Sequence, residues 1–144
     1  MDIFQSLKTS ASALQAQQIR LNTISSNLAN IETTRTPEGG PYKRKAVVFK
    51  TTTDASFEKQ LDHSLKGAVQ GVEVSEIVTD NSPPKTLYDP SHPDADANGY
   101  VAVPDIDLLE EMADLMSATR SYEANVTVIK SAKRMALKAL EIGK

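Results

Sequence analysis

Cysteine and tryptophan are missing from this chain, and aromatic side chains make up only 5% of its 144 residues. The absence of cysteine excludes disulfides, thiolate metal sites and cysteine nucleophiles together. The few aromatic residues argue against a large aromatic-centred core. The apolar fraction of 40% is also below the roughly 45–50% of typical globular domains. We therefore expect either one domain or a helical pair with a small second module.

An excess of basic residues is missing as well, because the formal net charge is −3 at pH 7. Nucleic-acid-binding domains carry clustered basic residues, so we expect no nucleic-acid partner. No run approaches the roughly 18–20 apolar residues that span a membrane, so we expect no direct membrane insertion. Residues 1–5 lack a basic region, an apolar run and a small-residue cleavage site, so we expect any export to leave the N-terminus intact.

What the chain does have is a heptad repeat of leucine near its start: Leu7, Leu14, Leu21 and Leu28. Extending it in steps of four and three gives a stripe with seven apolar positions of nine: Ile3, Leu7, Ser10, Leu14, Gln17, Leu21, Ile24, Leu28 and Ile31. Near the other end the same spacing gives eight of ten: Leu108, Met112, Leu115, Thr119, Tyr122, Val126, Ile129, Lys133, Ala136 and Leu140. Period-3.5 stripes indicate helices that pair with helices, so we predict that the two termini pair as a coiled coil.

The ends of both helices carry capping signals. We expect Asp2 to cap the first helix, which should run to about Asn30 before a loop rich in Thr, Pro and Gly. Asp105 or Asp107 should cap the last helix, which should stop at Gly143. Between the helices the helical period disappears. Residues 46–49 and 72–78 are rich in β-branched side chains and predict two strands, with proline turns at 83–84 and 89–93.

These signals predict an α+β fold, mainly α, with the terminal helices around a small insert. Residues 1–32 are the N-terminal helix of a helical core, 33–104 a loop-rich small β insert, and 105–144 the C-terminal helix of the core. The first 32 residues carry only four charges, which suits a helix surrounded by other protein or one half-covered by its own insert. The last helix starts acidic and ends basic, which either matches the helix dipole or joins consecutive subunits of a fibre.

Few motifs could carry chemistry. One set follows the calcium-loop spacing: Asp94, Asp96, Asn98, Gly99 and Asp105. Asp replaces the usual bidentate Glu, two prolines precede the loop and Pro104 lies inside it. An acidic turn is therefore the preferred interpretation and a calcium-binding adaptor the alternative. The basic run 43–45 is interpreted as a solvated face. Neither His63 nor His92 has a metal partner at helical spacing, and no nucleophile or phosphate motif occurs. We expect no catalytic residue, metal, cofactor or enzymatic activity.

Residues 25–34 read Ser-Ser-Asn-Leu-Ala-Asn-Ile-Glu-Thr-Thr and resemble the N-terminal signature of bacterial flagellar rod, hook and hook-associated proteins. The signature core is Asn27, Leu28, Ala29 and Asn30. Residues 110–112 and 120–125 resemble the matching C-terminal signature. Many relatives continue the first signature with Thr-Gly-Phe, whereas residues 34–45 differ here. Together with residues 88–93 and 99–101, this departure makes the chain similar to the short proximal rod proteins of the basal body.

The resemblance implies a non-enzymatic structural subunit of the proximal rod, the drive shaft that crosses the periplasm. It implies passage through the flagellar type III export apparatus, contacts with other rod proteins and its own copies, and terminal helices that order on assembly and transmit torque. The alternative within the family is another axial rod or hook position, whose members usually have larger inserts. The expected assembly interface consists of stripe side chains: Leu7, Leu14, Leu21, Ile24, Leu28, Leu115, Tyr122, Val126, Ile129 and Leu140.

Overall fold

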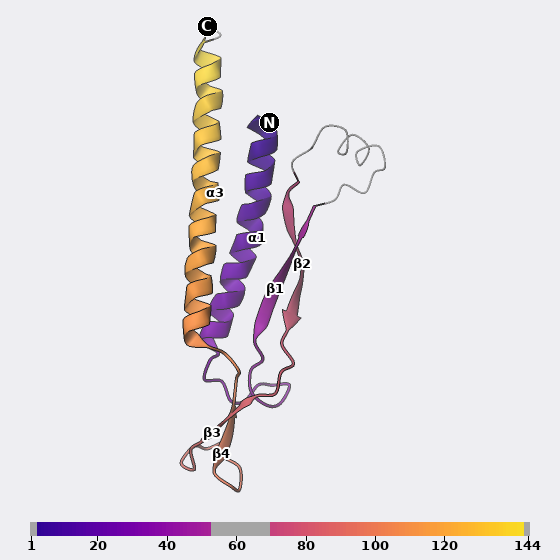
Figure 1. Ribbon diagram of the computed structural model, residues 1–144, viewed down its shortest axis with the longest axis vertical. Coiled ribbons are helices and arrows are strands. Elements are labelled where there is room, and N and C mark those ends of the chain that lie inside the picture. Colours follow the sequence, from indigo (N-terminus) through magenta and orange to yellow (C-terminus); the bar gives the residue numbers. More distant parts are fainter. Residues whose placement is uncertain (1–2, 53–69, 143–144) are drawn as a thin grey trace, which may run out of the picture.

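The computed structural model describes residues 3–52 and 70–142. Within these ranges the elements are α1 (Ile3–Ala29), β1 (Lys45–Thr51), β2 (Val72–Thr79), β3 (Lys85–Tyr88), β4 (Tyr100–Val103) and α3 (Leu108–Ile142). The two helices run side by side in opposite directions, and β1 and β2 lie along α1 (Figure 1). The β3–β4 hairpin lies beyond the helices, at the end where α1 stops and α3 starts. The expected α+β order of helix, β-rich insert and helix is confirmed.

Helix α1 ends one residue before the expected Asn30. The Asn30 amide N–H donates to the carbonyls of Ser26 and Asn27, both at 3.2 Å, and its side-chain Nδ2 donates to the Ser26 carbonyl at 2.8 Å. These bonds satisfy carbonyls that the end of a helix leaves without partners. The expected cap at Asp2 lies outside the described residues.

Helix α3 begins with a side-chain cap, as the sequence predicted. Asp107 accepts hydrogen bonds from the backbone N–H groups of Leu109 at 2.8 Å and Glu110 at 3.3 Å, which is the geometry of an N-cap aspartate. The other candidate, Asp105, instead forms an ion pair with Lys85 at 2.6 Å. The expected stop at Gly143 lies outside the described residues.

Three inner positions of the expected α3 stripe are exposed within this one chain. Met112 is 46% exposed and Thr119 and Lys133 are also exposed. The residue just before each of them is buried instead: Glu111, Ala118 and Ala132. One position rotates a side chain by about 100° around the helix. Small alanines let the helices approach closely, and Glu111 is buried because it finds polar partners there, so apolarity alone does not identify the buried positions.

Five other positions of that stripe are half-buried, namely Leu115, Tyr122, Val126, Ile129 and Ala136, and its end positions Leu108 and Leu140 are exposed. On α1 the buried positions are mostly small or polar: Ser10, Ala16, Thr23, Ile24 and Asn27. The stripe leucines of α1 are only half-buried. The helix pair of one chain therefore leaves part of its apolar surface uncovered.

Both predicted strands are confirmed. Strands β1 and β2 pair antiparallel from Lys45↔Thr79 to Thr51↔Val72, with a bulge between Val48 and Phe49. Val47 and Phe49 alternate with exposed neighbours along β1, so one face of the strand is covered. The β1–β2 hairpin contacts α1 but not the backbone of α3.

The β3–β4 hairpin was not predicted, because the sequence suggested only turns in this region. Its strands pair antiparallel from Lys85↔Val103 to Tyr88↔Tyr100, and the rings of Tyr88 and Tyr100 meet edge to face with centroids 5.3 Å apart. Gly99 has φ of 81°, which glycine adopts without steric cost. Val101, 2% exposed, anchors the hairpin.

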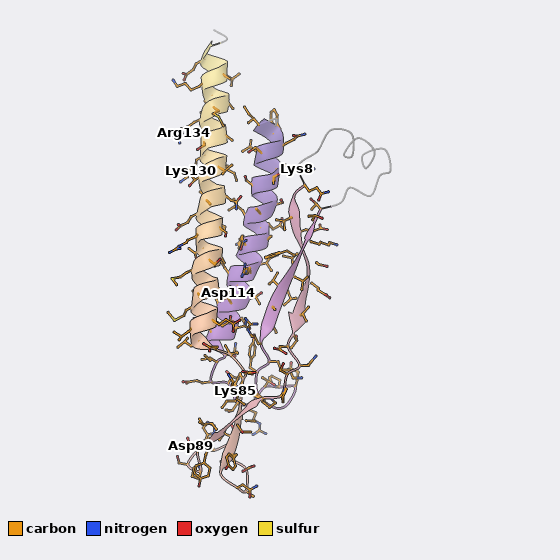
Figure 2. All side chains as sticks on the ribbon, in the orientation of Figure 1. Lys8, Lys85, Asp89, Asp114, Lys130 and Arg134 are labelled. Carbon is orange, nitrogen blue, oxygen red and sulfur yellow. The ribbon has the colours of Figure 1, made fainter. Side chains whose placement is uncertain are left out.

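Charge is distributed unevenly along the molecule. Lys130 and Arg134 lie on the far half of α3, whereas Asp114 lies near its start and Asp89 lies in the β3–β4 hairpin region (Figure 2). The acid-to-base polarity therefore runs along α3, whereas the hairpin region carries both signs, with Lys85 near Asp89 (Figure 2). Within the described ranges, neither helix combines the length and apolarity needed to cross a membrane.

Candidate functional site: a buried polar junction

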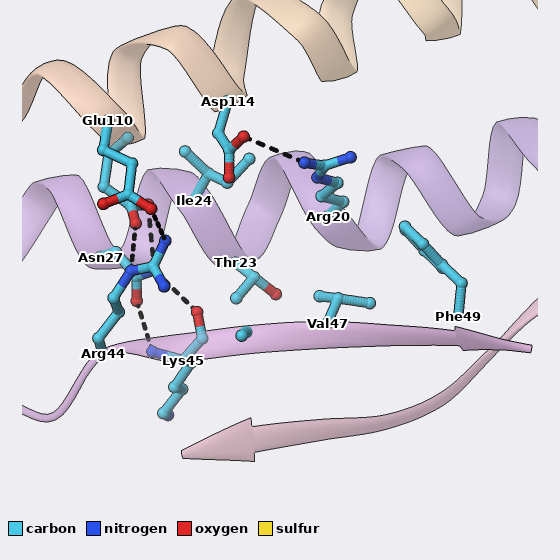
Figure 3. Close-up of a pocket in the computed structure, with 12 residues that line it drawn as sticks. Arg20, Thr23, Ile24, Asn27, Arg44, Lys45, Val47, Phe49, Glu110 and Asp114 are labelled. Carbon is cyan, nitrogen blue, oxygen red and sulfur yellow. Dashed lines mark hydrogen bonds and ion pairs between the residues drawn. The ribbon is translucent and has the colours of Figure 1, made fainter. Parts of the chain in front are cut away.

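Three polar side chains from distant parts of the sequence meet where α1, β1 and α3 converge (Figure 3). Asn27 comes from the last turn of α1, Arg44 directly precedes β1, and Glu111 comes from the first turn of α3. Asn27 is 1% exposed and Glu111 0% exposed. We call these three residues the junction. A buried carboxylate and a buried amide are stable only where their polar atoms are satisfied.

The Asn27 side chain pairs with the backbone of Lys45 as a neighbouring strand would. Its Nδ2 donates to the Lys45 carbonyl at 2.8 Å, and its Oδ1 accepts from the Lys45 N–H at 2.9 Å. The Tyr42 hydroxyl donates to the same Oδ1 at 3.1 Å, and Nδ2 also donates to Glu111 Oε2 at 3.1 Å. Both donor and both acceptor positions of the amide are therefore used.

Glu111 is held by Arg44. The Arg44 Nε donates to Glu111 Oε1 at 2.6 Å, and an Arg44 Nη2 lies 3.6 Å from Glu110 Oε1. Burial by itself would lower the pKa of Arg44, but the hydrogen bond to Glu111 and the charges of Glu111, Glu110 and Asp114 outweigh it and raise this pKa. Removing one partner of a buried ion pair costs about 3–5 kcal/mol because the other charge stays buried. Arg44 and Glu111 thus depend on each other.

A shallow groove of about 400 Å³ runs beside the junction between α1, α3 and β1. Arg20 of α1 pairs with Asp114 of α3 across it at 3.2 Å, with side chains 30% and 39% exposed. This half-exposed pair should contribute only about 0–1 kcal/mol. The groove is lined by the paired charges of Arg20, Arg44, Glu111 and Asp114 and by apolar side chains of α1 and β1.

The acidic turn does not converge on one point. Asp94 accepts a hydrogen bond from the Thr34 hydroxyl at 2.7 Å, and Asp96 accepts from the N–H groups of Asn98 and Tyr100. Asp105 pairs with Lys85. In the part of the chain that the structure describes, no three His, Cys, Asp or Glu side chains form a metal-like cluster. The arrangement therefore favours the acidic-turn interpretation. His63 lies outside the described residues.

The expected assembly residues lie along the helix pair at different depths. Ile24 is 4% exposed, whereas Leu140, near the far end of α3, is 71% exposed. The remaining eight are half-buried: Leu7, Leu14, Leu21, Leu28, Leu115, Tyr122, Val126 and Ile129. Of the signature residues, Asn27 belongs to the junction, Asn30 ends α1 by its bonds to Ser26, Leu28 is half-buried and Ala29 is exposed.

Sequence reasoning missed the junction. Asn27 was selected as part of a signature, without a physical role. Arg44 was interpreted as part of a solvated run, but its side chain is only 25% exposed, while Lys43 and Lys45 are exposed. The sequence feature that could have indicated the junction was a pair of carboxylates, Glu110 and Glu111, in the first turn of a helix, together with an arginine directly before a strand.

Comparison with known proteins shows that Asn27 and Glu111 each lie in a segment that matches a protein family. Residues 7–35, which include Asn27, match the family model "Flagella basal body rod protein". Residues 97–142, which include Glu111, match "Flagellar basal body rod FlgEFG protein C-terminal". Arg44 lies between the two matched segments.

Three relatives are named flagellar basal-body rod protein FlgC. The Bacillus subtilis protein is 50% identical over 151 residues, covering 100% of both chains. The Borreliella burgdorferi protein is 44% identical over 149 residues, 99% of this chain and 98% of the relative. The Salmonella typhimurium protein is 44% identical over 132 residues, 92% and 91% of the two chains. The expected similarity to the short proximal rod proteins is confirmed: the chain belongs to the FlgC family of flagellar basal-body rod proteins and is a structural subunit of that rod.

Proposed function

We propose that this rod subunit transmits torque through its terminal helices, which complete their packing only against neighbouring subunits. The observation that supports the proposal is the uncovered apolar surface of the helix pair. The stripe leucines of α1 are half-buried, and on α3 Leu109, Met116 and Leu140 are 76%, 57% and 71% exposed. Burying apolar surface contributes roughly 25 cal/mol per Å², so neighbours that cover these side chains stabilise the assembled rod.

The polar surface of α1 fits the same role. Of the described α1 residues only Lys8 and Arg20 are charged, and Arg20 is paired with Asp114. A helix with so few charges can be surrounded by protein without leaving unpaired ions buried, which would cost several kcal/mol each. In the rod, we infer, the α1–α3 pair tightens into a coiled coil with other rod proteins and with copies of this chain.

We assign the segments of the chain to two layers of the rod, a core and an outer layer. Residues 1–32 and 105–144 form the helical core, and residues 33–104 form a layer around it. The β1–β2 hairpin lies along α1 on one side only (Figure 1), which supports an outer location for this part of the insert. The position in the rod is the proximal one, and the basal body is the site of action.

Delivery to the rod is proposed to use the flagellar type III export apparatus. Membership of the flagellar rod family supports this route, because the resemblance to that family implies passage through the same apparatus.

The experiment is a motility test in a bacterium whose own gene for this subunit is deleted. The variants Leu14→Asp and Leu21→Asp put a charge on the half-buried stripe and should abolish swimming while the subunit is still synthesised. The controls Ser75→Asp and Thr79→Asp place the same charge at exposed positions of β2, in the proposed outer layer, and should swim normally. Normal swimming of either stripe variant would contradict the role of the helices.

A further inference from the structure

The insert has two kinds of attachment to the helical core. It contacts α1 at two places, where the Val72 N–H donates to Ser12 Oγ at 3.2 Å and where Lys45 pairs with Asn27. These places are separated by about 22 Å along the helix axis, at 1.5 Å per residue. Two such anchors on α1 fix the direction of the β1–β2 hairpin relative to that helix.

The attachment to α3 is narrower. In residues 3–52 and 70–142, the side-chain hydrogen bonds and ion pairs between the β1–β2 hairpin region and α3 all come from Arg44, which reaches Glu110 and Glu111. Figure 3 shows the Arg44 side chain extending from the start of β1 to the start of α3. This ion pair is thus the direct polar link between the hairpin region and α3, which is otherwise placed relative to the hairpin through its packing against α1.

Asn27 connects the two attachments. Its amide bonds the backbone of Lys45 and the carboxylate of Glu111 at the same time. A displacement of α3 that moved Glu111 would act on Asn27 as well as on Arg44, and through both on the first residue of β1. Such a fully satisfied polar network fixes one geometry, because partly satisfied alternatives leave buried groups without partners.

We propose that the junction of Asn27, Arg44 and Glu111 is a mechanical link that holds the insert at a fixed position on the helix pair, so that torque carried by α1 and α3 reaches the insert. The claim that torque reaches the insert rests on the proposed role in torque transmission. The claim that the junction fixes the position of the insert concerns the isolated chain and is independent of that role. The junction acts by positioning rather than by adding stability. Apolar side chains of similar size can replace a buried ion pair without loss of stability, but they do not provide its directional bonds.

The test uses distances between spin labels, which the chain suits because it contains no cysteine. One label pair joins the hairpin to α3 (Glu76→Cys with Ala113→Cys) and the other joins the hairpin to α1 (Glu76→Cys with Asn22→Cys). All three positions are exposed. The Arg44→Met/Glu111→Met double variant removes the ionic link. The matched control, Arg20→Met/Asp114→Met, removes the half-exposed pair in the same groove.

In the junction double variant, the hairpin-to-α3 distances should broaden and shift to longer values, while the hairpin-to-α1 distances stay narrow. The control should leave both distributions unchanged. Unchanged hairpin-to-α3 distances in a folded junction variant, or equal broadening in the control, would overturn the proposal. If the double variant does not fold, Arg44→Lys serves instead. It keeps the charge but loses the planar fork, and it should broaden the same distance.

Swimming in viscous medium is the second readout. Cells with the junction variant should incorporate the subunit and lose speed under load more steeply than cells with the control variant. Equal speeds combined with broadened distances would remove the torque role of the junction but keep its positioning role. Because the distances are measured without a rod, a failure of the torque proposal is distinguishable from a failure of the structural one.

Discussion

Ser12 on α1 lies directly against Gly71 at the start of the hairpin strand β2. A Cβ atom added at Gly71 would lie 2.8 Å from Ser12 Oγ and 2.9 Å from Thr52 Oγ1. Gly71 does not have a positive φ, so its backbone conformation does not call for a glycine. The close approach of Ser12 and Thr52, which leaves no room for a Cβ atom, is what requires it. This contact is the attachment of the hairpin to α1 at the end opposite the junction.

Replacing Gly71 with alanine should therefore lower stability by overpacking. We expect Gly71→Ala to reduce the free energy of unfolding by about 1–3 kcal/mol, measured by urea denaturation. Gln70→Ala, at an exposed neighbour, is the matched control and should change the free energy of unfolding little. Equal stabilities of the two variants would show that the hairpin moves away from α1 without cost.

The cap of α3 makes a second prediction. Asp107→Ala removes the acceptor for the N–H groups of Leu109 and Glu110 and should cost about 0.5–2 kcal/mol. Asp107→Asn keeps a capping oxygen and should retain most of the stability in the same thermal unfolding experiment. An alanine variant as stable as the asparagine variant would mean that α3 begins elsewhere in solution.

The third prediction concerns pH. Hydrogen bonds from the side chain and backbone of Ser91 lower the pKa of Asp89 below its ordinary value. A lowered folded-state pKa stabilises the fold at pH above the ordinary aspartate pKa, and the contribution disappears as pH falls through the lowered value. Its hydrogen bonds to Ser91 lie at the exposed surface, so the effect should be seen in the titration of Asp89 itself rather than in large stability changes.

NMR titration should place the Asp89 midpoint below that of an unperturbed aspartate, and Ser91→Ala should raise it. The chain contains a matched control, because Ser82 lowers the pKa of Asp80 by the same kind of bonds. Ser82→Ala should raise the Asp80 midpoint and leave Asp89 unchanged. An Asp89 midpoint that Ser91→Ala does not move would assign the shift to another group.

The sequence predicted the long elements because their signals are repeated many times. Helix α1 shows its period over 27 residues and α3 over 35, and β1 and β2 contain clusters of β-branched residues. Strands β3 and β4 have four residues each, too few to show an alternation. Prolines at 83 and 84 also precede β3, and they indicated a turn.

The junction was harder to predict for a different reason. Apolarity identifies side chains that are buried by the hydrophobic effect. Glu111 is instead buried because Arg44 and Asn27 donate hydrogen bonds to its carboxylate. Those partners lie 67 and 84 residues away, so no local pattern reports them. The same limit produced the one-position difference on α3, where Met112 was preferred to Glu111 on hydropathy alone.

The order of the junction residues along the chain has a consequence for synthesis and delivery. Asn27 and Arg44 lie in the first third of the sequence, and Glu111 follows in the last third. A chain that is only partly made or partly emerged has the arginine without its carboxylate. The junction can therefore form only after α3 has been added to the chain. A subunit that includes α3 can hold its insert in the orientation that a neighbouring subunit meets.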